Sequence, residues 1–245
     1  MLTHSNTLLP FMVIHVIGSL AWFFGVIDPV FLIISLAAHL AVLAYGSAVP
    51  AAGFFIAQRT RGAAGTVALT YDDGPVPGRT EALLDLLREE GVTATFFCIG
   101  ERIERSPELA RRIIAEGHSI GVHTQRHLWW WGFMSSSRAL KEIQECISTI
   151  QLVTGCEPQL FRPPFGVTSP NTANAIHQSG LETVAWDLRT FDTVSRADNS
   201  LVERTLGKLE HSSIVLLHDT APGVIPATKA IIERARERGT ILVRL

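Results

Sequence analysis

Two adjacent carboxylates, Asp72 and Asp73, follow a short apolar run at residues 66–69 that is typical of a buried strand. Neighbouring carboxylates at such a position are costly in free energy unless a metal ion or another cation shares the site. Further along the chain, His123 and His127 also follow an apolar run. One aspartate and two histidines leave a fourth zinc position open to water, which is typical of a catalytic site. The other carboxylate can accept a proton from that water, so the pattern predicts a metal hydrolase.

The first 57 residues differ from the rest of the chain. They contain no lysine or arginine and one acidic residue, Asp28. Two apolar runs, Leu8–Ile27 and Val30–Val49, flank that residue, and each has about the 20 residues that a membrane helix needs. A cleaved signal peptide fits poorly, because no basic residues precede the apolar stretch and the stretch is too long. We expect two membrane-spanning helices over residues 1–58; a buried hairpin in a protein core is the alternative.

The first positive charges after the predicted hairpin are Arg59 and Arg61. The positive-inside rule then predicts an integral cell-membrane protein with both chain ends and the catalytic domain on the cytoplasmic face. Residues 62–245 have nearly balanced charge and no basic stripe, so nucleic acid is not an expected partner. The three cysteines lack Cys-x-x-Cys spacing, and they indicate neither a disulfide framework nor a thiolate zinc site.

Short apolar runs alternate with helical patterns throughout residues 62–245, which we expect to form one domain. The predicted strands are Val67–Tyr71, Ala94–Ile99, Ser119–Val122, Gln159–Arg162, Leu181–Trp186, Ser213–Leu217 and Thr240–Arg244. Alternating strands and helices with right-handed crossovers give a parallel sheet. Seven strands with a helix between each pair predict an α/β fold, a distorted (β/α)7 barrel.

Barrels of this kind carry their chemistry at the C-terminal ends of the strands. The candidate residues all fall at that rim: Asp72 and Asp73 after the first strand, His123 and His127 after the third, Arg162 at the end of the fourth, Asp192 beyond the fifth, and His218 after the sixth. Random placement would not bring them to one rim.

Four motifs occur in order along this domain: Thr70–Pro75 (TYDDGP), His123–His127 (HTQRH), Arg162–Gly166 (RPPFG) and Leu216–His218 (LLH). Together they resemble the ordered motifs of the NodB-type polysaccharide deacetylases, carbohydrate esterase family 4. The resemblance runs from about Thr66 to the C-terminus and leaves the hairpin outside. The two histidines alone would be unspecific, whereas four motifs in order are specific.

The resemblance implies that Asp72 is the general base and that Asp73, His123 and His127 bind a divalent metal, Zn²⁺ first and Co²⁺ as the alternative. It implies that Arg162 pairs with the base, since a neighbouring cation favours a charged carboxylate.

By the same resemblance His218 is the general acid for the departing nitrogen, because an imidazole titrates close to working pH. Asp192 is expected to support it. The backbone N–H of Phe165 is expected to be an oxyanion donor, and Leu216 is expected to line the acyl pocket.

The chain departs from the family pattern at two places. Thr193 stands where the family usually has a tryptophan that helps to wall the acyl pocket. His127 is followed by Leu128 and three tryptophans, Trp129–Trp131, rather than by the frequent proline. One of these indoles could close the pocket or stack on a sugar, and Trp130 is our candidate for substrate binding. They could equally anchor the domain at the membrane interface, where tryptophan is enriched.

The predicted function is removal of an N-acetyl or other N-acyl group from an amino sugar of a polysaccharide or lipid-linked saccharide. The hairpin favours a substrate at the membrane. A non-catalytic, membrane-anchored glycan-binding module on the same fold and a glycan O-deacetylase are the alternatives. A pure binder has no need for a paired proton donor and acceptor, which argues against the first of these.

Overall fold

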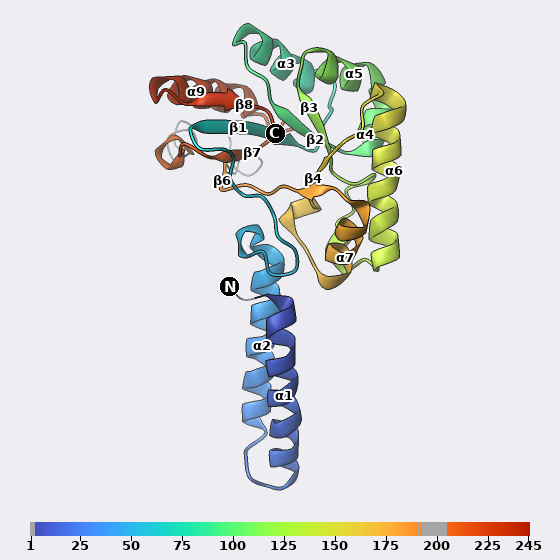
Figure 1. The fold of residues 1–245 in the computed structure, drawn as a ribbon, viewed down its shortest axis with the longest axis vertical. Coiled ribbons are helices and arrows are strands. Elements are labelled where there is room, and N and C mark those ends of the chain that lie inside the picture. Colours follow the sequence, from blue (N-terminus) through green and yellow to red (C-terminus); the bar gives the residue numbers. More distant parts are fainter. Residues whose placement is uncertain (1–2, 191, 193–204) are drawn as a thin grey trace.

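The structure is a computed structural model that describes residues 3–190, 192 and 205–245. A long helical hairpin extends from one side of an α/β domain (Figure 1). The domain confirms the predicted fold, because its strands form one curled parallel sheet of the incomplete-barrel type.

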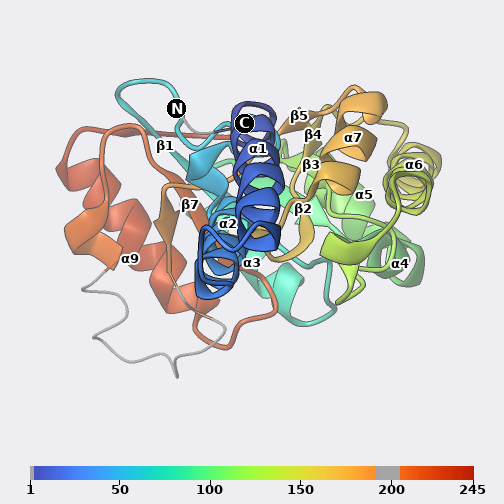
Figure 2. The same cartoon turned by 90° about the horizontal axis from the view of Figure 1, so that it is seen from below.

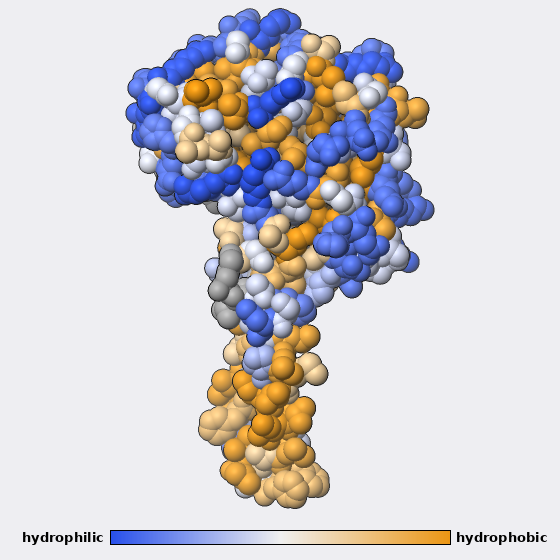
Figure 3. Space-filling view, viewed as in Figure 1, coloured by the Kyte–Doolittle hydropathy of each residue, from blue (hydrophilic) through white to orange (hydrophobic). Residues whose placement is uncertain are grey.

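The hairpin consists of α1 (His4–Phe23) and α2 (Val30–Ala48). Asp28 caps the second helix, with its Oδ1 accepting the Val30 N–H at 2.8 Å. Both helices are long and apolar enough to cross a membrane, and they bury little of their surface; a signal sequence near an N-terminus can have the same properties. Figure 3 shows apolar residues covering most of the hairpin, in contrast to the largely polar outer surface of the domain.

Eight strands are described: β1 (Thr66–Asp72), β2 (Thr95–Cys98), β3 (Ser119–Val122), β4 (Leu160–Phe161), β5 (Glu182–Thr183), β6 (Leu188–Arg189), β7 (Ile214–His218) and β8 (Ile241–Val243). Their order is β5-β4-β3-β2-β1-β7-β6, and every pairing is parallel. Strand β8 pairs with the first half of β1. The central strand β1 therefore places Asp72 in the middle of the rim.

The predicted strand Leu181–Trp186 is shorter in the structure, and β6 was not predicted. Only Glu182 and Thr183 pair with β4. The next residue, Val184, forms an isolated bridge with Arg59, because the chain segment that enters the domain from the hairpin occupies that edge. The chain then turns, and β6 pairs with β7 instead.

Helices follow the strands and cover the outer face of the sheet (Figures 1 and 2). They are α3 (Arg79–Glu89), α4 (Gly100–Arg105), α5 (Pro107–Ala115), α6 (Ser136–Thr154), α7 (Pro170–Ser179) and α9 (Val224–Glu237), with short 3-10 turns η1 (Pro50–Ala52), η2 (Trp131–Phe133) and η3 (Pro164–Gly166).

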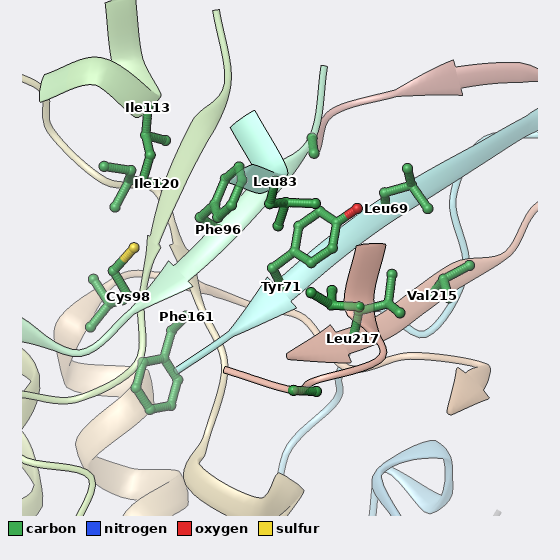
Figure 4. Packing of buried hydrophobic residues seen from close by; sticks show 14 of the residues in the cluster. Leu69, Tyr71, Leu83, Phe96, Cys98, Ile113, Ile120, Phe161, Val215 and Leu217 are labelled. Atoms are coloured by element: carbon green, nitrogen blue, oxygen red, sulfur yellow. The ribbon is translucent and has the colours of Figure 1, made fainter. Parts of the chain in front are cut away.

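The two faces of β1 have different roles, since successive side chains of a strand point to opposite faces. Leu69 and Tyr71 belong to the large core beneath the helices, together with Cys98 of β2 (Figure 4). Ala68 belongs to a smaller cluster on the inner face. The same alternation places Asp72 on that inner face, where the polar site is built.

Candidate active site

Asp72 is held in place by the sheet and by one buried arginine. In the strand register it lies between Phe97 of β2 and His218 of β7. Only 4% of its surface is exposed, and its Oδ1 accepts a hydrogen bond from Arg162 Nη1 at 2.7 Å. The other carboxylate oxygen, Oδ2, lies 3.9 Å from His123 Nε2 and so faces the two-histidine group.

Arg162 has no exposed surface, and each nitrogen of its guanidinium donates at least one hydrogen bond. Besides Asp72, it donates to Thr70 Oγ1 at 2.8 Å and to the carbonyl oxygens of Val184 and Ala185 at 3.2 and 2.9 Å. The guanidinium also lies over the Phe97 ring, 4.1 Å from its centroid. Burial lowers the pKa of Arg162, and the Asp72 charge opposes that shift. A buried charge this well paired fixes its partner's position.

Asp73, His123 and His127 form the group that could hold a metal ion. Asp73 Oδ1 lies 3.5 Å from Nε2 of each histidine, and one ligand atom from each residue falls within 4.8 Å of the others. His123 Nδ1 lies 2.7 Å from the Arg162 carbonyl oxygen. A donated bond there leaves the Nε2 lone pair directed at Asp73, which is the usual second contact of a metal-binding histidine.

The charge states of this group suit a cation. Burial and the neighbouring His123 lower the pKa of His127 to about 4, so its imidazole is neutral near pH 7. Burial by itself would raise the pKa of Asp73, but the hydrogen bond and charges of the surrounding histidines lower it below its usual value. Neutral imidazoles and an ionised carboxylate are the forms that bind metal.

Backbone strain gathers at the same place. The described non-glycine residues with positive φ are Asp73 (76°), Thr124 (64°), His127 (50°) and Phe165 (60°). Thr124 stabilises its turn by accepting the His127 N–H at 3.0 Å on its Oγ1. Such backbone costs on the order of 1–3 kcal/mol per residue and persists where surrounding contacts impose it, typically at functional sites.

His218 and Asp192 lie on the other side of Asp72. His218 Nδ1 is 2.9 Å from Asp192 Oδ1, and the His218 backbone N–H donates to Oδ2 at 2.7 Å. Burial opposes protonation of His218, but the Asp192 hydrogen bond and the charges of Asp72, Asp192 and Asp73 raise its pKa above the usual value. The site therefore has an imidazole biased toward the protonated form, beside a carboxylate that Arg162 holds.

Two supporting residues were not predicted from the sequence. Arg102 Nη1 donates to the Asp73 carbonyl oxygen at 2.8 Å and so holds the strained turn. Asp219 has no exposed surface; its Oδ2 accepts the Thr80 hydroxyl at 2.6 Å, and its Oδ1 has no hydrogen-bond partner among the described residues. Burial raises the pKa of Asp219 to about 7. A Cβ on Gly74 would lie 1.9 Å from Asp219 Oδ2, so only glycine fits there.

The remaining predicted residues lie around this centre. Leu216 is buried on β7 beside Thr70, and strand alternation puts it on the face that carries His218. Phe165 is half exposed, and its ring centroid lies 4.6 Å from that of His127. Trp130 remains 40% exposed.

Two predictions about the acyl pocket need separate comment. Thr193 lies outside the described residues. Trp131 is 1% exposed, and its indole N–H donates to the Val167 carbonyl oxygen at 3.0 Å. It packs against Phe161 in the core and does not reach the surface, so it is excluded as a sugar-stacking or membrane-anchoring residue. Trp129 and Trp130 remain exposed and touch each other edge to face.

Comparisons with known proteins give a consistent result. The polysaccharide deacetylase family model matches residues 59–184. A peptidoglycan-N-acetylglucosamine deacetylase of Bacillus cereus is 36% identical over 157 residues, which are 62% of this chain and 72% of that protein. The peptidoglycan-N-acetylmuramic acid deacetylase PdaC of Bacillus subtilis is 31% identical over 177 residues, or 72% of this chain. The chain spans 37% of the length of PdaC.

Solved structures support the same fold. A crystal structure of a peptidoglycan N-acetylglucosamine deacetylase superposes with a TM-score of 0.73 at 29% identity, covering 77% of this chain and 90% of that one. A family 4 carbohydrate esterase from Streptomyces lividans gives 0.68 at 29% identity, covering 74% and 93%. A pseudoenzyme of family CE4 from Bacillus anthracis shares the fold, with a TM-score of 0.71 at 22% identity, covering 76% and 66%. The fold by itself thus does not establish catalysis, and the side chains must carry that argument.

Proposed function

The chain belongs to the polysaccharide deacetylase family, and on that premise we propose that it is a metal-dependent hydrolase that removes the N-acetyl group from an amino sugar of a glycan. One observation carries the proposal. A group able to bind a metal lies beside a carboxylate paired with a buried arginine, and an imidazole paired with a buried aspartate lies next to that carboxylate on the neighbouring strand. Amide hydrolysis needs a proton acceptor and a proton donor on opposite sides of the bond.

Asp73, His123 and His127 would hold the metal, with Zn²⁺ as the first candidate and Co²⁺ as the second. Two imidazoles and one carboxylate match the ligand set of a catalytic zinc site. When bound, such an ion lowers the pKa of water toward ~7 and polarises a carbonyl. The hydrogen bond of His123 to Arg162 and that of Arg102 to Asp73 orient two of the three ligands.

Asp72 is the proposed general base. Its Oδ1 is occupied by Arg162, and its Oδ2 faces the metal-binding group and is available to accept a proton. Arg162 cannot rotate away, because its other donors are bound to Thr70 and to two backbone carbonyls. The Asp72 carboxylate is therefore in position before substrate binds. Such preorganisation of reacting and charged groups supplies much of the rate enhancement of enzymes.

His218 is the proposed general acid. Asp192 binds its Nδ1, so the Nε2 proton is the one that can pass to the amine nitrogen as the carbon–nitrogen bond breaks. The raised pKa of His218 favours the protonated form that a general acid needs.

The proposal extends to substrate contacts. The Phe165 backbone N–H is an oxyanion donor, supported by the strained φ of 60° that fixes this residue beside His127. Leu216 lines the acyl pocket, and Trp130 stacks on the sugar. The exposed indole of Trp130 and the burial of Leu216 on the His218 face support these roles.

We also propose that residues 1–58 anchor the protein in the cell membrane and that residues 62–245 form the catalytic domain on the cytoplasmic face. Two apolar helices with outward-facing side chains support the anchor, and Arg59 and Arg61 support the orientation. A cytoplasmic domain cannot reach assembled cell wall. The proposed substrate is therefore a lipid-linked saccharide, although the relatives named above act on peptidoglycan.

The alternative of a glycan-binding module is disfavoured by the Asp72–Arg162 and His218–Asp192 pairs, which a binder would keep at a cost in stability. A direct assay separates the candidates. Purified full-length protein with added Zn²⁺ or Co²⁺ is given N-acetylated, O-acetylated and lipid-linked sugars, and released acetate and free amine are measured. Acetate with an equal amount of amine supports the proposal. Acetate without amine indicates O-deacetylation, and binding without either product indicates the module.

A further inference from the structure

Large aromatic side chains lie exposed beside the active site. Phe133 is 89% exposed, Trp129 is 76% exposed and Phe165 is 54% exposed. Single exposed apolar residues are ordinary, but a group of aromatic residues in one place marks an interaction surface. We call these three residues the aromatic rim.

The aromatic rim is fixed to the active site. The Phe165 ring contacts His127, one of the proposed metal ligands. The segment carrying Trp129 and Phe133 is held against the Phe165 loop, because the buried Trp131 donates its indole N–H to Val167. A Cβ on Gly132 would lie 2.8 Å from Val167 Cγ1, so the two segments are in close contact.

The loop that carries Phe165 is also bonded to the hairpin, at the end of α2 that lies next to the domain. Ser47, in the last turn of α2, donates its hydroxyl to the Thr168 carbonyl oxygen at 2.7 Å, and its own carbonyl accepts the Thr168 N–H at 3.2 Å. A Cβ on Gly166 would lie 3.1 Å from Pro50, just beyond α2. The rim loop therefore sits at the end of the apolar helices.

The lengths place this junction at a membrane surface. Helices of 20 and 19 residues span about 30 Å, roughly the hydrocarbon thickness of a bilayer. Once the hairpin is inserted, Ser47 lies where hydrocarbon gives way to headgroups. Tryptophan and other aromatic side chains are enriched at that depth.

We propose that the aromatic rim contacts the bilayer surface and seats the mouth of the active site against the lipid headgroups. The inference rests on the proposed membrane insertion of the hairpin. The chosen occupant is the membrane, because the loop that carries Phe165 is bonded to Ser47 of α2 and contacts Pro50 just beyond that apolar helix. An active site held at the level of the headgroups can reach an amino sugar that is attached to a lipid of the same bilayer.

The test compares three positions on the full-length protein reconstituted in phosphatidylcholine–phosphatidylglycerol vesicles. Cys156→Ser first removes the one cysteine that is not buried. Single variants Phe133→Cys, Leu152→Cys and Ile17→Cys are then spin-labelled. Leu152 is the matched control for Phe133: it is 87% exposed, but it lies near the far end of α6, about 24 Å along that 19-residue helix. Helix α6 runs roughly parallel to the hairpin (Figures 1 and 2).

Collision rates with oxygen, which concentrates in lipid, and with a water-soluble nickel chelate give the result. The label at position 133 should have an oxygen-to-nickel ratio above that of the label at 152 and below that of the hairpin label at 17. If the label at 133 behaves like the label at 152 while the label at 17 reports lipid, the rim does not contact the bilayer. That result overturns the proposal and leaves membrane insertion of the hairpin unaffected. A water-exposed label at 17 overturns both. A label at 133 shielded from both reagents, with spin–spin broadening, shows a second copy of the chain on this surface and also overturns the proposal.

Discussion

Arg162 Nη1 and Asp72 Oδ1 are joined by a 2.7 Å hydrogen bond inside the protein, where the arginine has no exposed surface. The bond connects residues 90 positions apart in the chain. Both come from the ends of parallel strands, so the sheet brings them together. Because one carboxylate oxygen is fixed in this way, the other is directed toward the metal-binding group.

Asp72→Asn tests the division of roles between the two adjacent aspartates. The variant should bind metal as the native protein does, because Asp73 and both histidines remain. Turnover should fall by roughly 10²–10⁴-fold, the loss typical of a positioned proton-transfer group. Metal content by atomic absorption and acetate release check the two halves. An Asp72→Asn protein without metal would mean that the two aspartates are assigned the wrong way round.

Arg162→Met should destabilise the protein strongly. Removing one member of a buried ion pair leaves the other charge uncompensated, at a cost of about 3–5 kcal/mol. Arg61→Met is the matched control, since the Arg61–Glu210 pair lies at the surface, with both side chains more than half exposed. Surface pairs are worth about 0–1 kcal/mol. Denaturant unfolding of the two variants measures the difference, and equal losses would contradict the structural role of Arg162.

Asp192→Asn should change the pH profile. Asp192 contributes to the raised pKa of His218, so its loss lowers that pKa. A general acid works while protonated, and activity declines as pH rises through its pKa. The alkaline limb of turnover should therefore move to lower pH in the variant. A pH–rate profile measured with saturating metal checks this, and an unmoved alkaline limb would show that His218 is not the acid.

Much of the site was predictable because its residues come from strand ends. Short apolar runs followed by polar motifs locate the rim, and parallel strands bring their C-terminal ends together. This reasoning placed Asp72 and Asp73 at one rim with His123 and His127, and in the structure Asp73 Oδ1 lies 3.5 Å from both histidines.

The rest depends on contacts that no local pattern encodes. The sequence indicates only that Asp219 lies in a loop after a strand, and the fold brings it to Thr80, 139 positions away. The three consecutive tryptophans look equivalent in sequence, yet the 3-10 turn η2 turns Trp131 into the core and leaves its neighbours outside. The extra strand β6 has only two residues, and the bridge between Arg59 and Val184 depends on the junction with the hairpin.

Asp219→Asn should alter the dependence of stability on pH. The folded-state pKa of Asp219 is raised to about 7, above its ordinary value, so folding favours the protonated form. Its contribution is fully present below the unfolded pKa of ~3.9 and is lost as pH rises toward 7. Asparagine resembles the protonated carboxyl and does not titrate, so the stability of the variant relative to native should increase between pH 4 and 8.

The measurement is the thermal unfolding midpoint across that pH range, in detergent. Asp85→Asn is the control, because Asp85 is a surface carboxylate with 47% of its side chain exposed. That variant should show no comparable rise. A stability difference between Asp219→Asn and native that stays constant across the range would refute a buried carboxyl that titrates near neutral pH.

The most direct test of the account is the metal dependence of deacetylation. The full-length protein is stripped with a chelator and assayed on N-acetylated amino-sugar oligomers and lipid-linked amino sugars, without metal and with one equivalent of Zn²⁺ restored. His123→Ala and His127→Ala serve as variants that lack one ligand each. The account predicts that turnover disappears with the metal, returns with zinc in the native protein, and does not return in either variant. Full release of acetate and free amine by the metal-free native protein would contradict it.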